Sequence, residues 1–427
     1  VGFSDSVFQL LYRLVSSGSD RDSSRVNPDI ARYAAESGFM ETFRNFLAAF
    51  NPKIDVSPKG LISLLTFFHD VLSSDSASLC TKLLDESIIT VLISFLDESG
   101  ILALSEWPTM YSGGPAAVTR TVSQVLRILT LPFVHVAYQS SAKVIGKEYA
   151  TADLVKHTFY SMKLVARETI PYTVTLLSQL VLNDDRERPF AKQFIAVRGL
   201  TIIQKYNLLA EENSASVLID VLSLISQLAR ISKDNYEMIL QLNMYQSLRT
   251  MIQHRDAGVR SKACNLIGNL CRHSGMFYDT LLREGLITAA IKCCNDPDRS
   301  TRKFACFAVG NAGFHNEKLY EHLRPSVPLL VDLLKDPEEK TRANAAGALG
   351  NFVRNSNTLC RDLILHGALN QLLEVVKNDP GPSQSPRRIA LFSIGNLCVY
   401  PECKTVFEDL NIRQTLDGLL PSTVDSQ

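Results

Sequence analysis

The chain has 427 residues, of which 46% are hydrophobic and 21% are charged, a balance that is typical of folded proteins and excludes wholesale disorder. Lys plus Arg equals Asp plus Glu at 44 each, so the overall charge gives no general attraction to nucleic acid or to an anionic membrane, and neither is expected as a partner. No apolar run reaches the roughly 18 residues of a membrane-spanning helix, so membrane insertion is not expected.

Residues 1–210 show helical periodicity with two interruptions. A Ser- and Asp-rich stretch at residues 16–24 predicts a loop, and the Gly- and Pro-containing segment 97–115 predicts an irregular insertion around Trp107. The predicted helices cover residues 28–35, 40–50, 61–72, 77–84, 88–96, 116–128, 150–168, 172–182 and 189–209. We therefore predict divergent armadillo- or HEAT-like repeats over residues 1–210, whose phase the sequence does not reveal.

From residue 211 onward a period of about 42 residues is visible. Runs of small apolar residues end in a Gly-Asn dipeptide at Asn269, Asn311, Asn351 and Asn396, at intervals of 42, 40 and 45 residues, and a fainter copy ends at Gln227. Each period holds a long helix, a loop and two shorter helices, which is the armadillo arrangement. We therefore predict an all-α chain that forms a right-handed armadillo/HEAT-type helical-repeat solenoid, with armadillo repeats over residues 211–427.

The asparagine row and the side chains beside it form a candidate partner-binding groove. Residues three or four apart share a helix face, and counting from each asparagine gives a set of amides, aromatics and cations. An outward amide offers a donor and an acceptor to the backbone of an extended peptide, while the cations favour an acidic ligand. The candidate residues are Gln227, Asn265, Asn269, Arg272, Lys303, Phe307, Asn311, Phe314, Asn351, Arg354, Arg388, Phe392 and Asn396.

A purely architectural role for the same dipeptide is the alternative. Glycine permits two helices to approach closely, and a buried asparagine amide can bond a neighbouring loop. The counted positions also include Gly347 and Val399, which have no binding chemistry of their own. The sequence leaves both interpretations of the Gly-Asn row open.

The tripeptide His254-Arg255-Asp256 matches part of a kinase catalytic loop. In that motif a magnesium-binding asparagine follows the aspartate by five positions, where Ser261 stands here. The sequence contains no Gly-rich phosphate loop, no D-F-G and no A-P-E motif. A helix start before Gly258 explains the tripeptide better, so we expect no catalytic residue in this chain.

The cysteine and histidine residues indicate a reducing, cytoplasmic location without a metal site. Nine cysteines occur without a regular framework or a C-x-x-C spacing, so a disulfide scaffold is not expected. Cys264 and Cys306 stand beside small apolar residues in predicted helices, where a free thiol behaves as a small hydrophobe. No His and Cys spacing fits a zinc site, and we expect neither a metal ion nor another cofactor.

Three segments resemble the C-terminal armadillo region of Fused-family serine/threonine kinases. They are SKACNLIGNLCRHSG at residues 261–275, DPDRSTRKFACFAVGNA at 296–312, and KTRANAAGALGN at 340–351, which VRNSN follows at 353–357. The resemblance extends over about residues 261–397. It implies a parent protein with an N-terminal, ATP-dependent serine/threonine kinase domain that this sequence does not include.

The resemblance also implies a function and partners. It implies a non-catalytic scaffold that recruits a kinesin-like protein, a related pseudokinase or its own kinase domain. The family's settings are Hedgehog signalling, ciliary central-pair assembly and plant cytokinesis, so the implied location is the cytoplasm, extending to the cilium, axoneme or microtubules.

An importin-α-like cargo adaptor that binds extended peptides is the alternative function. Importin-α carries tryptophans four residues before its asparagines, where this sequence has Asn265, Phe307, Gly347 and Phe392. This difference puts the binding of nuclear signals in doubt.

Overall fold

The computed structural model describes residues 2–15, 28–36, 38, 41–42, 45–46, 56–74, 84–106, 113–138 and 140–418, which form helices and turns and no β-strand. The predicted all-α class is confirmed for this part of the chain. Two compact units are present, Val1–Ile202 and Ile203–Gln427. Their division lies a few residues before the boundary that the sequence predicted at 210.

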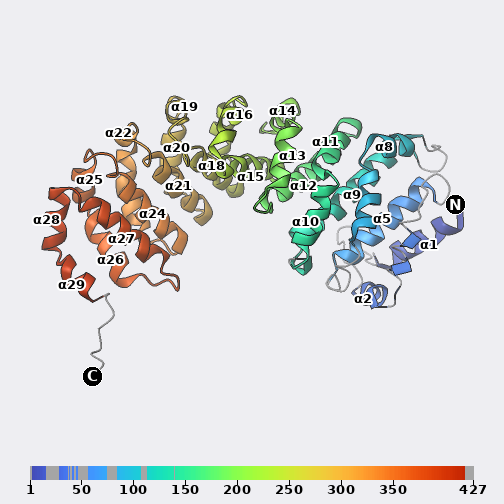
Figure 1. Ribbon diagram of the computed structural model, residues 1–427, viewed down its shortest axis with the longest axis horizontal. Helices are drawn as coiled ribbons and strands as arrows, with labels where there is room; N and C mark the ends of the chain where they lie inside the picture. The colour runs from blue at the N-terminus through green and yellow to red at the C-terminus, as the bar shows by residue number, and fades with distance from the viewer. Residues whose placement is uncertain are drawn as a thin grey trace, which may run out of the picture. The chain divides into compact units, whose positions relative to one another are not determined.

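Each repeat of the second unit contains one long helix, followed by two shorter helices (Figure 1). The long helices are α15 (Ala215–Ile231), α18 (Ala257–Leu270), α21 (Arg299–Ala312), α24 (Glu339–Asn351) and α27 (Ser385–Leu397). The shorter helices are α16 (Tyr236–Leu240), α17 (Tyr245–Met251), α19 (Tyr278–Arg283), α20 (Leu286–Cys293), α22 (Tyr320–Leu323), α23 (Val327–Leu333), α25 (Cys360–Leu365), α26 (Ala368–Asn378), α28 (Pro401–Asp409) and α29 (Ile412–Asp417). Consecutive long helices pack against each other from α15 to α27.

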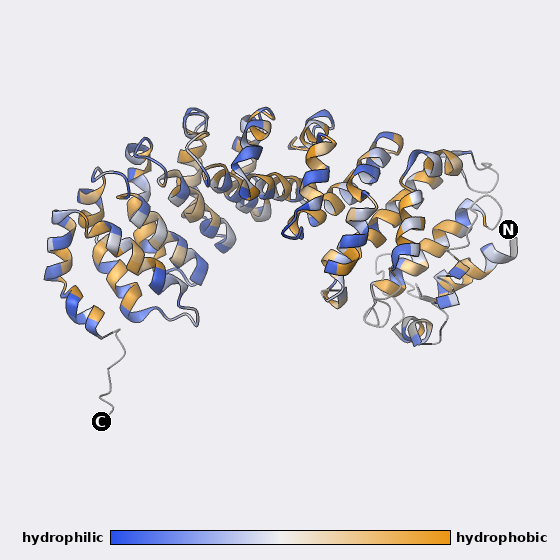
Figure 2. Cartoon of the chain, in the orientation of Figure 1, coloured by the Kyte–Doolittle hydropathy of each residue, from blue (hydrophilic) through white to orange (hydrophobic). Residues whose placement is uncertain are grey.

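The first unit contains helices of more varied length. They are α1 (Gly2–Val15), α2 (Pro28–Glu36), α5 (Pro58–Leu72), α7 (Glu86–Ser94), α8 (Glu98–Ser105), α9 (Pro115–Val134), α10 (Ala142–Thr151), α11 (Leu154–Leu164), α12 (Ile170–Leu182) and α13 (Pro189–Ala196), and α14 (Gly199–Lys205) includes the division. The long helices α5, α9 and α12 pack in sequence, as α15 to α27 do in the second unit. Hydrophobic and hydrophilic residues alternate around these helices, and the hydrophobic ones supply the cores (Figure 2).

One residue with a left-handed backbone joins the two short helices of most repeats. These residues are Asp153, Arg198, Asn243, Gly285, Gly367 and Asn411, with φ between 46° and 70°. They recur at intervals of 42 to 45 residues, except between Gly285 and Gly367, where a 3-10 turn at Arg324–Ser326 takes the place of one such residue. Left-handed residues at this spacing therefore mark the repeats as far back as α10. The sequence pattern did not reveal these earlier repeats.

Two helices that the sequence predicts as continuous are interrupted at these residues. The predicted helix at 150–168 is divided by Asp153 into the end of α10 and the whole of α11. The predicted helix at 189–209 is divided by Arg198 into α13 and α14. Both predictions were wrong because the left-handed residue is Asp or Arg instead of the glycine that usually signals this conformation.

The segment predicted as an irregular insertion at 97–115 is partly helical. Asp97 caps α8 by accepting a hydrogen bond from the N–H of Gly100 at 2.7 Å, and Pro115 begins α9. Trp107 lies outside the described residues, as do the predicted loop at 16–24 and most of the predicted helices at 40–50 and 77–84. No single described helix is long and apolar enough to span a membrane, and α7 and α8 meet that test only together, with a bend of 59° between them.

Candidate partner-binding surface

The long helices of the second unit present a stripe of exposed or half-buried residues, which we call the ladder stripe. It comprises the residues four before, at and three after each Gly-Asn asparagine, together with the exposed or half-buried cations one turn earlier. The members are Lys262, Asn265, Arg272, Lys303, Phe307, Asn311, Phe314, Gly347, Asn351, Arg354, Arg388, Phe392, Asn396 and Val399. Gln227 is half-buried on α15 and accepts a hydrogen bond from Arg230 Nε at 2.9 Å. Counting helix positions in the sequence therefore selected the accessible face, with one exception at Asn269.

The ladder asparagines join each repeat to the preceding one. The side-chain Nδ2 donates to the carbonyl oxygen of the glycine in the preceding Gly-Asn dipeptide. The bonds are Asn311 to Gly268 at 2.8 Å, Asn351 to Gly310 at 3.0 Å, and Asn396 to Gly350 at 3.2 Å. These three amides thus have the architectural role that the sequence analysis left as an alternative, while their half-buried side chains remain partly accessible.

The prediction that Asn269 belongs to the partner-binding groove is wrong. Its side chain is only 2% exposed, so it is not available to a partner in this structure. Its Nδ2 donates to Ser226 Oγ at 2.8 Å and to Asn265 Oδ1 at 3.1 Å. Ser226 replaces glycine in the fainter copy of the signature, which explains why the first amide of the row bonds a side chain instead of a backbone carbonyl.

The glycines of the dipeptides allow neighbouring long helices to touch. A Cβ atom at Gly350 would lie 2.7 Å from Ser393 Cα, and one at Gly268 would lie 2.4 Å from Phe307 Cδ1. At Gly310 the nearest atom would be Ala348 Cβ at 3.1 Å. The short amide bonds between repeats depend on this close approach.

A row of tyrosines adds a second set of bonds between repeats, which the sequence analysis missed. The hydroxyl groups of Tyr236, Tyr278 and Tyr320 each donate to the backbone carbonyl of a ladder asparagine in the next long helix, at 2.6, 2.9 and 2.8 Å. Each hydroxyl also accepts a backbone N–H from the loop that follows that asparagine. Burial raises the pKa of Tyr236 to about 12. The spacing of 42 residues between successive tyrosines was the signal that could have identified them.

Arginine and aspartate side chains form a third row at the opposite end of the long helices. The pairs are Arg260 with Asp296 at 2.8 Å, Arg302 with Asp336 at 2.7 Å, and Arg342 with Asp379 at 2.6 Å. Each arginine also donates to two carbonyl groups of the turn that precedes its own helix. Burial by itself would raise the pKa of Asp296, but the hydrogen bond from Arg260 and a backbone N–H lower it below its ordinary value.

The kinase-like tripeptide His254-Arg255-Asp256 is one of these turns. Asp256 caps α18 by accepting the N–H of Val259 at 3.2 Å, and His254 Nδ1 accepts the N–H of Asp256 at 3.0 Å. Arg260 donates to the carbonyl oxygens of His254 and Arg255. The helix-start interpretation of the tripeptide is therefore confirmed.

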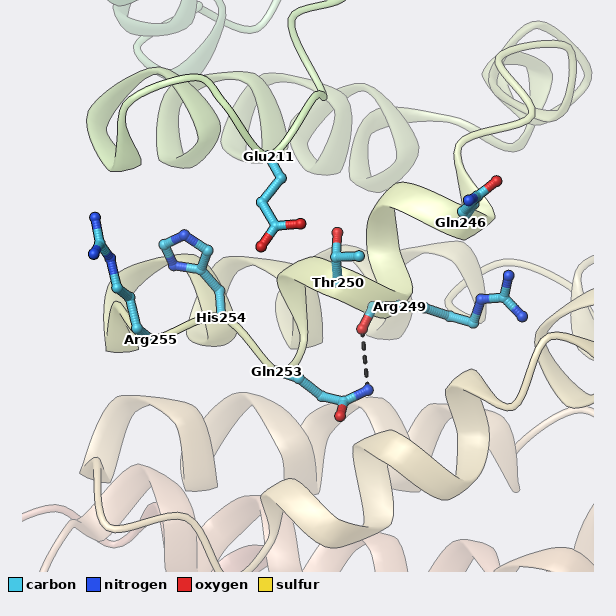
Figure 3. Close-up of a pocket in the computed structure, with 7 residues that line it drawn as sticks. All are labelled: Glu211, Gln246, Arg249, Thr250, Gln253, His254 and Arg255. Atoms are coloured by element: carbon cyan, nitrogen blue, oxygen red, sulfur yellow. Dashed lines mark hydrogen bonds between the residues drawn. The ribbon is translucent and has the colours of Figure 1, made fainter.

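An open pocket of about 660 Å³ lies beside this turn (Figure 3). Its lining residues are Glu211, Gln246, Arg249, Thr250, Gln253, His254 and Arg255. Figure 3 shows His254 and Arg255 side by side on the turn, while Gln253 donates to the carbonyl oxygen of Arg249 at 3.2 Å. Over the described part of the chain, no three His, Cys, Asp or Glu side chains are grouped to hold a metal ion.

The charge of the ladder stripe is positive. Its charged members are Lys262, Arg272, Lys303, Arg354 and Arg388, and no Asp or Glu occupies any of its positions on α18, α21, α24 or α27. The guanidinium of Arg354 lies over the ring of Phe314, at 4.3 Å from the ring centre. Burial lowers the pKa of Lys262, the negative charge of Asp220 on α15 partly opposes this, and the positive charge of Lys303 lowers the pKa further. The stripe therefore combines cations with three of the aromatic residues predicted from the sequence, of which Phe392 is exposed and Phe307 and Phe314 are half-buried.

Comparisons with known proteins support the fold and a relationship to a kinase. Residues 287–395 match a family model described as HEAT repeats. The serine/threonine-protein kinase TIO of Arabidopsis thaliana is 47% identical over 89 residues, which are 18% of this chain and 7% of that kinase. The chain thus matches only a small part of that relative's length.

Two engineered proteins of known crystal structure share the fold. One has a TM-score of 0.75 at 13% identity over 98% of this chain and 91% of its own, and the other has a TM-score of 0.51 at 16% identity over 57% and 95%. Together with the HEAT-repeat match, this similarity confirms the predicted helical-repeat solenoid.

Proposed function

We propose that this chain is the non-catalytic, protein-recruiting region of a Fused-like serine/threonine kinase. The stretch that is 47% identical to a serine/threonine kinase is the observation that carries the link to a kinase parent. Helical repeats expose long, regular faces and commonly serve as binding surfaces. The parent protein would be an ATP-dependent kinase, and this region would supply its contacts with other proteins.

The ladder stripe is the surface that we assign to this role. Its residues come from four successive helices, and the amide bonds between repeats hold them in a fixed register. Phe392 is 71% exposed, Arg388 is exposed one turn before it on α27, and Arg354 is exposed over the ring of Phe314. Aromatic and arginine side chains are the residue types that contribute most binding energy at protein interfaces.

The partner classes follow from the family resemblance. They are a kinesin-like protein, a related pseudokinase or the kinase domain of the same protein. The corresponding settings are Hedgehog signalling, the central pair of the cilium and cytokinesis, with a location in the cytoplasm at the cilium, axoneme or microtubules. An importin-α-like adaptor for basic peptides is less well supported, because the stripe offers no carboxylate to a cationic ligand.

Binding of these three partner classes to the purified chain tests the proposal. We expect at least one of them to bind saturably, and the triple variant Arg272→Glu, Arg354→Glu, Arg388→Glu to bind it at least about tenfold more weakly. The matched control is Lys292→Glu, Lys335→Glu, Arg361→Glu, which reverses three exposed cations outside the stripe. Equal losses in the two variants, or no binding by any partner, would contradict the proposal.

A further inference from the structure

The last described repeat, α27 to α29, leaves uncovered a helix face that the three repeats before it bury (Figure 1). Gly395, directly before the ladder asparagine of α27, is exposed, and a Cβ atom there would have no neighbour within 4 Å. Leu391 and Cys398, one turn to either side, are half-buried, whereas the residues at both positions of α18, α21 and α24 are buried. The glycines equivalent to Gly395 are buried against the next long helix, and they are Gly268, Gly310 and Gly350.

The short helix α29 is uncovered in the same way. The equivalent helices α20, α23 and α26 each pack against the long helix that follows, and each buries several apolar residues. Helix α29 buries no residue, Ile412 is half-buried, and Leu416 is 40% exposed. A further long helix would pack on α27 and α29 together, as α24 packs on α21 and α23. We call this surface the end face, and it comprises Arg387, Leu391, Gly395, Cys398, Ile412 and Leu416.

Arg387 gives the end face a position for a carboxylate. It is the next member of the arginine row, because it stands nine residues before its ladder asparagine, as Arg342 and Arg302 do. Those two arginines each pair with an aspartate of the turn before the next long helix. The Nε atom of Arg387 is buried and has no hydrogen-bond partner within the described part of the chain. A buried donor without an acceptor is costly, so a helix that brings a carboxylate here is favoured.

The earlier interfaces specify what a helix needs in order to fit. On α24 and its preceding turn, Asp336 pairs with Arg302 of the helix before. Ala348, twelve residues later, lies where a Cβ atom at Gly310 would be 3.1 Å from its own Cβ. Asn351, three residues beyond that, donates to the carbonyl oxygen of Gly310 at 3.0 Å. The turn and helix of α21 carry the same three residue types at the same spacing.

We propose that the end face docks one helix of a partner protein, which carries an aspartate, a small residue twelve positions later and an asparagine three positions beyond that. The aspartate pairs with Arg387, and the asparagine amide donates to the carbonyl oxygen of Gly395. Apolar side chains of the helix cover Leu391 and Leu416. The end face lies outside the ladder stripe, so the proposal goes beyond the proposed function and does not depend on it.

Other segments of the chain are less suitable occupants. The helices with this residue pattern, α21 and α24, already pack between their neighbours, so a second copy could supply one only by unfolding a repeat. A symmetric contact between two end faces would bring together Arg387 and Arg388 of both copies, which repel each other. Residues 419–427 are fewer than the 13 residues of α24. The chemistry of the end face therefore favours a helix from a partner protein.

Fluorescence anisotropy with a labelled synthetic peptide tests the proposal on the full chain. The probe has the sequence of residues 334–356, with alanine at positions 347 and 350 to stabilise the helix. The control peptide carries three further changes, Asp336→Lys, Ala348→Leu and Asn351→Leu. We expect saturable binding of the probe, at least about tenfold tighter than that of the control. No saturable binding of the probe, or equal affinities of the two peptides, would overturn the proposal.

A substitution in the end face provides the second part of the test. Gly395→Leu occupies the surface that the small residue of the docked helix approaches, so it should weaken binding of the probe at least about tenfold. It should not lower the melting temperature, because the position is open and leucine favours a helix more than glycine does. Unchanged affinity of this variant would contradict the proposal.

A variant of the ladder stripe is the matched control for the site of binding. Arg272→Glu, Arg354→Glu leaves the end face intact and should bind the probe within about threefold of the wild-type affinity. A loss equal to that of Gly395→Leu would place the peptide on the ladder stripe and contradict the proposal. A dimer of the chain, detected by sedimentation velocity and dissociated by Gly395→Leu, would assign the end face to a second copy and also contradict it. None of these outcomes changes the test of the proposed function, which uses protein partners and the ladder stripe.

Discussion

The two units of this chain use the same three-helix repeat but join their repeats differently. In the second unit, α24 buries Ala345, Ala346, Ala348 and Gly350, so neighbouring helices approach closely and their polar groups bond across the gap. In the first unit, the long helix α9 instead buries large aliphatic residues. The large residues are Val122, Val125, Leu126, Ile128 and Leu129. Small residues make polar bonds between repeats possible and impose a strict period, whereas aliphatic packing tolerates varied sequences.

The largest expected effect comes from the buried ion pair between α24 and the turn before α27. Arg342 and Asp379 have side-chain exposures of 5% and 3%, so Asp379→Ala leaves an uncompensated buried charge. We expect a loss of about 3–5 kcal/mol in the free energy of unfolding, measured by urea denaturation. The double variant Arg342→Met, Asp379→Leu should recover most of the lost free energy of unfolding. A loss below about 1 kcal/mol in the single variant would show that the arginine–aspartate pairs do not hold neighbouring repeats together.

Alanine substitution at Gly350 and at Gly146 should have opposite effects. Gly350→Ala places a Cβ atom against Ser393, and we expect about 1–3 kcal/mol of destabilisation. At Gly146 of α10 the nearest atom to such a Cβ would be 4.0 Å away, so Gly146→Ala should stabilise by about 0.4–1 kcal/mol. Denaturant titration of both variants measures the two changes in the free energy of unfolding. Equal changes would show that Gly350 is packed no more tightly than Gly146.

The tyrosine row should make the second unit sensitive to alkali. Burial raises the pKa of Tyr236 to about 12 in the folded chain, against about 10 when unfolded. The neutral hydroxyl therefore contributes stability that is complete below about pH 10 and is lost as the pH rises through about 12. Tyr236→Phe should lower stability by about 1 kcal/mol at neutral pH and reduce its decline between pH 10 and 12. An unchanged alkaline profile would contradict this role.

The smallest effect should come from the left-handed residues that set the repeat phase. Arg198 has φ 55°, a conformation that is unfavourable for a residue with a side chain, so Arg198→Gly should stabilise by about 0.5–1 kcal/mol. Gly285→Ala in the second unit should destabilise by about 1 kcal/mol or more, because its φ is 70°. Thermal unfolding of both variants is the measurement, and destabilisation by Arg198→Gly would show that the Arg198 side chain has a separate role.

The sequence predicted the repeats best where glycine and asparagine mark them. The recurring Gly-Asn dipeptides gave the positions of α18, α21, α24 and α27. Counting three or four residues along the helix from each asparagine gave the residues of the ladder stripe. It did not distinguish buried Asn269 from half-buried Asn311, because that difference depends on Ser226 in the preceding repeat. The arginine and tyrosine rows were missed because each bond joins residues 31 to 37 positions apart. The turns at Asp153 and Arg198 were not predicted, because neither residue type usually indicates a left-handed backbone.

Thermal stability and partner affinity of the variant Asn311→Ala, Asn351→Ala, Asn396→Ala provide the most direct test of the roles assigned to the stripe. Each substitution removes an amide bond between repeats, so we predict a lower melting temperature, with about 1 kcal/mol lost per bond. The affinity for a protein partner, measured below the melting transition, should stay within about threefold, because Phe392 and the arginines remain in place. An unchanged melting temperature with a tenfold or greater loss of affinity would contradict the assignment, since the amides would then bind the partner instead of the preceding repeat.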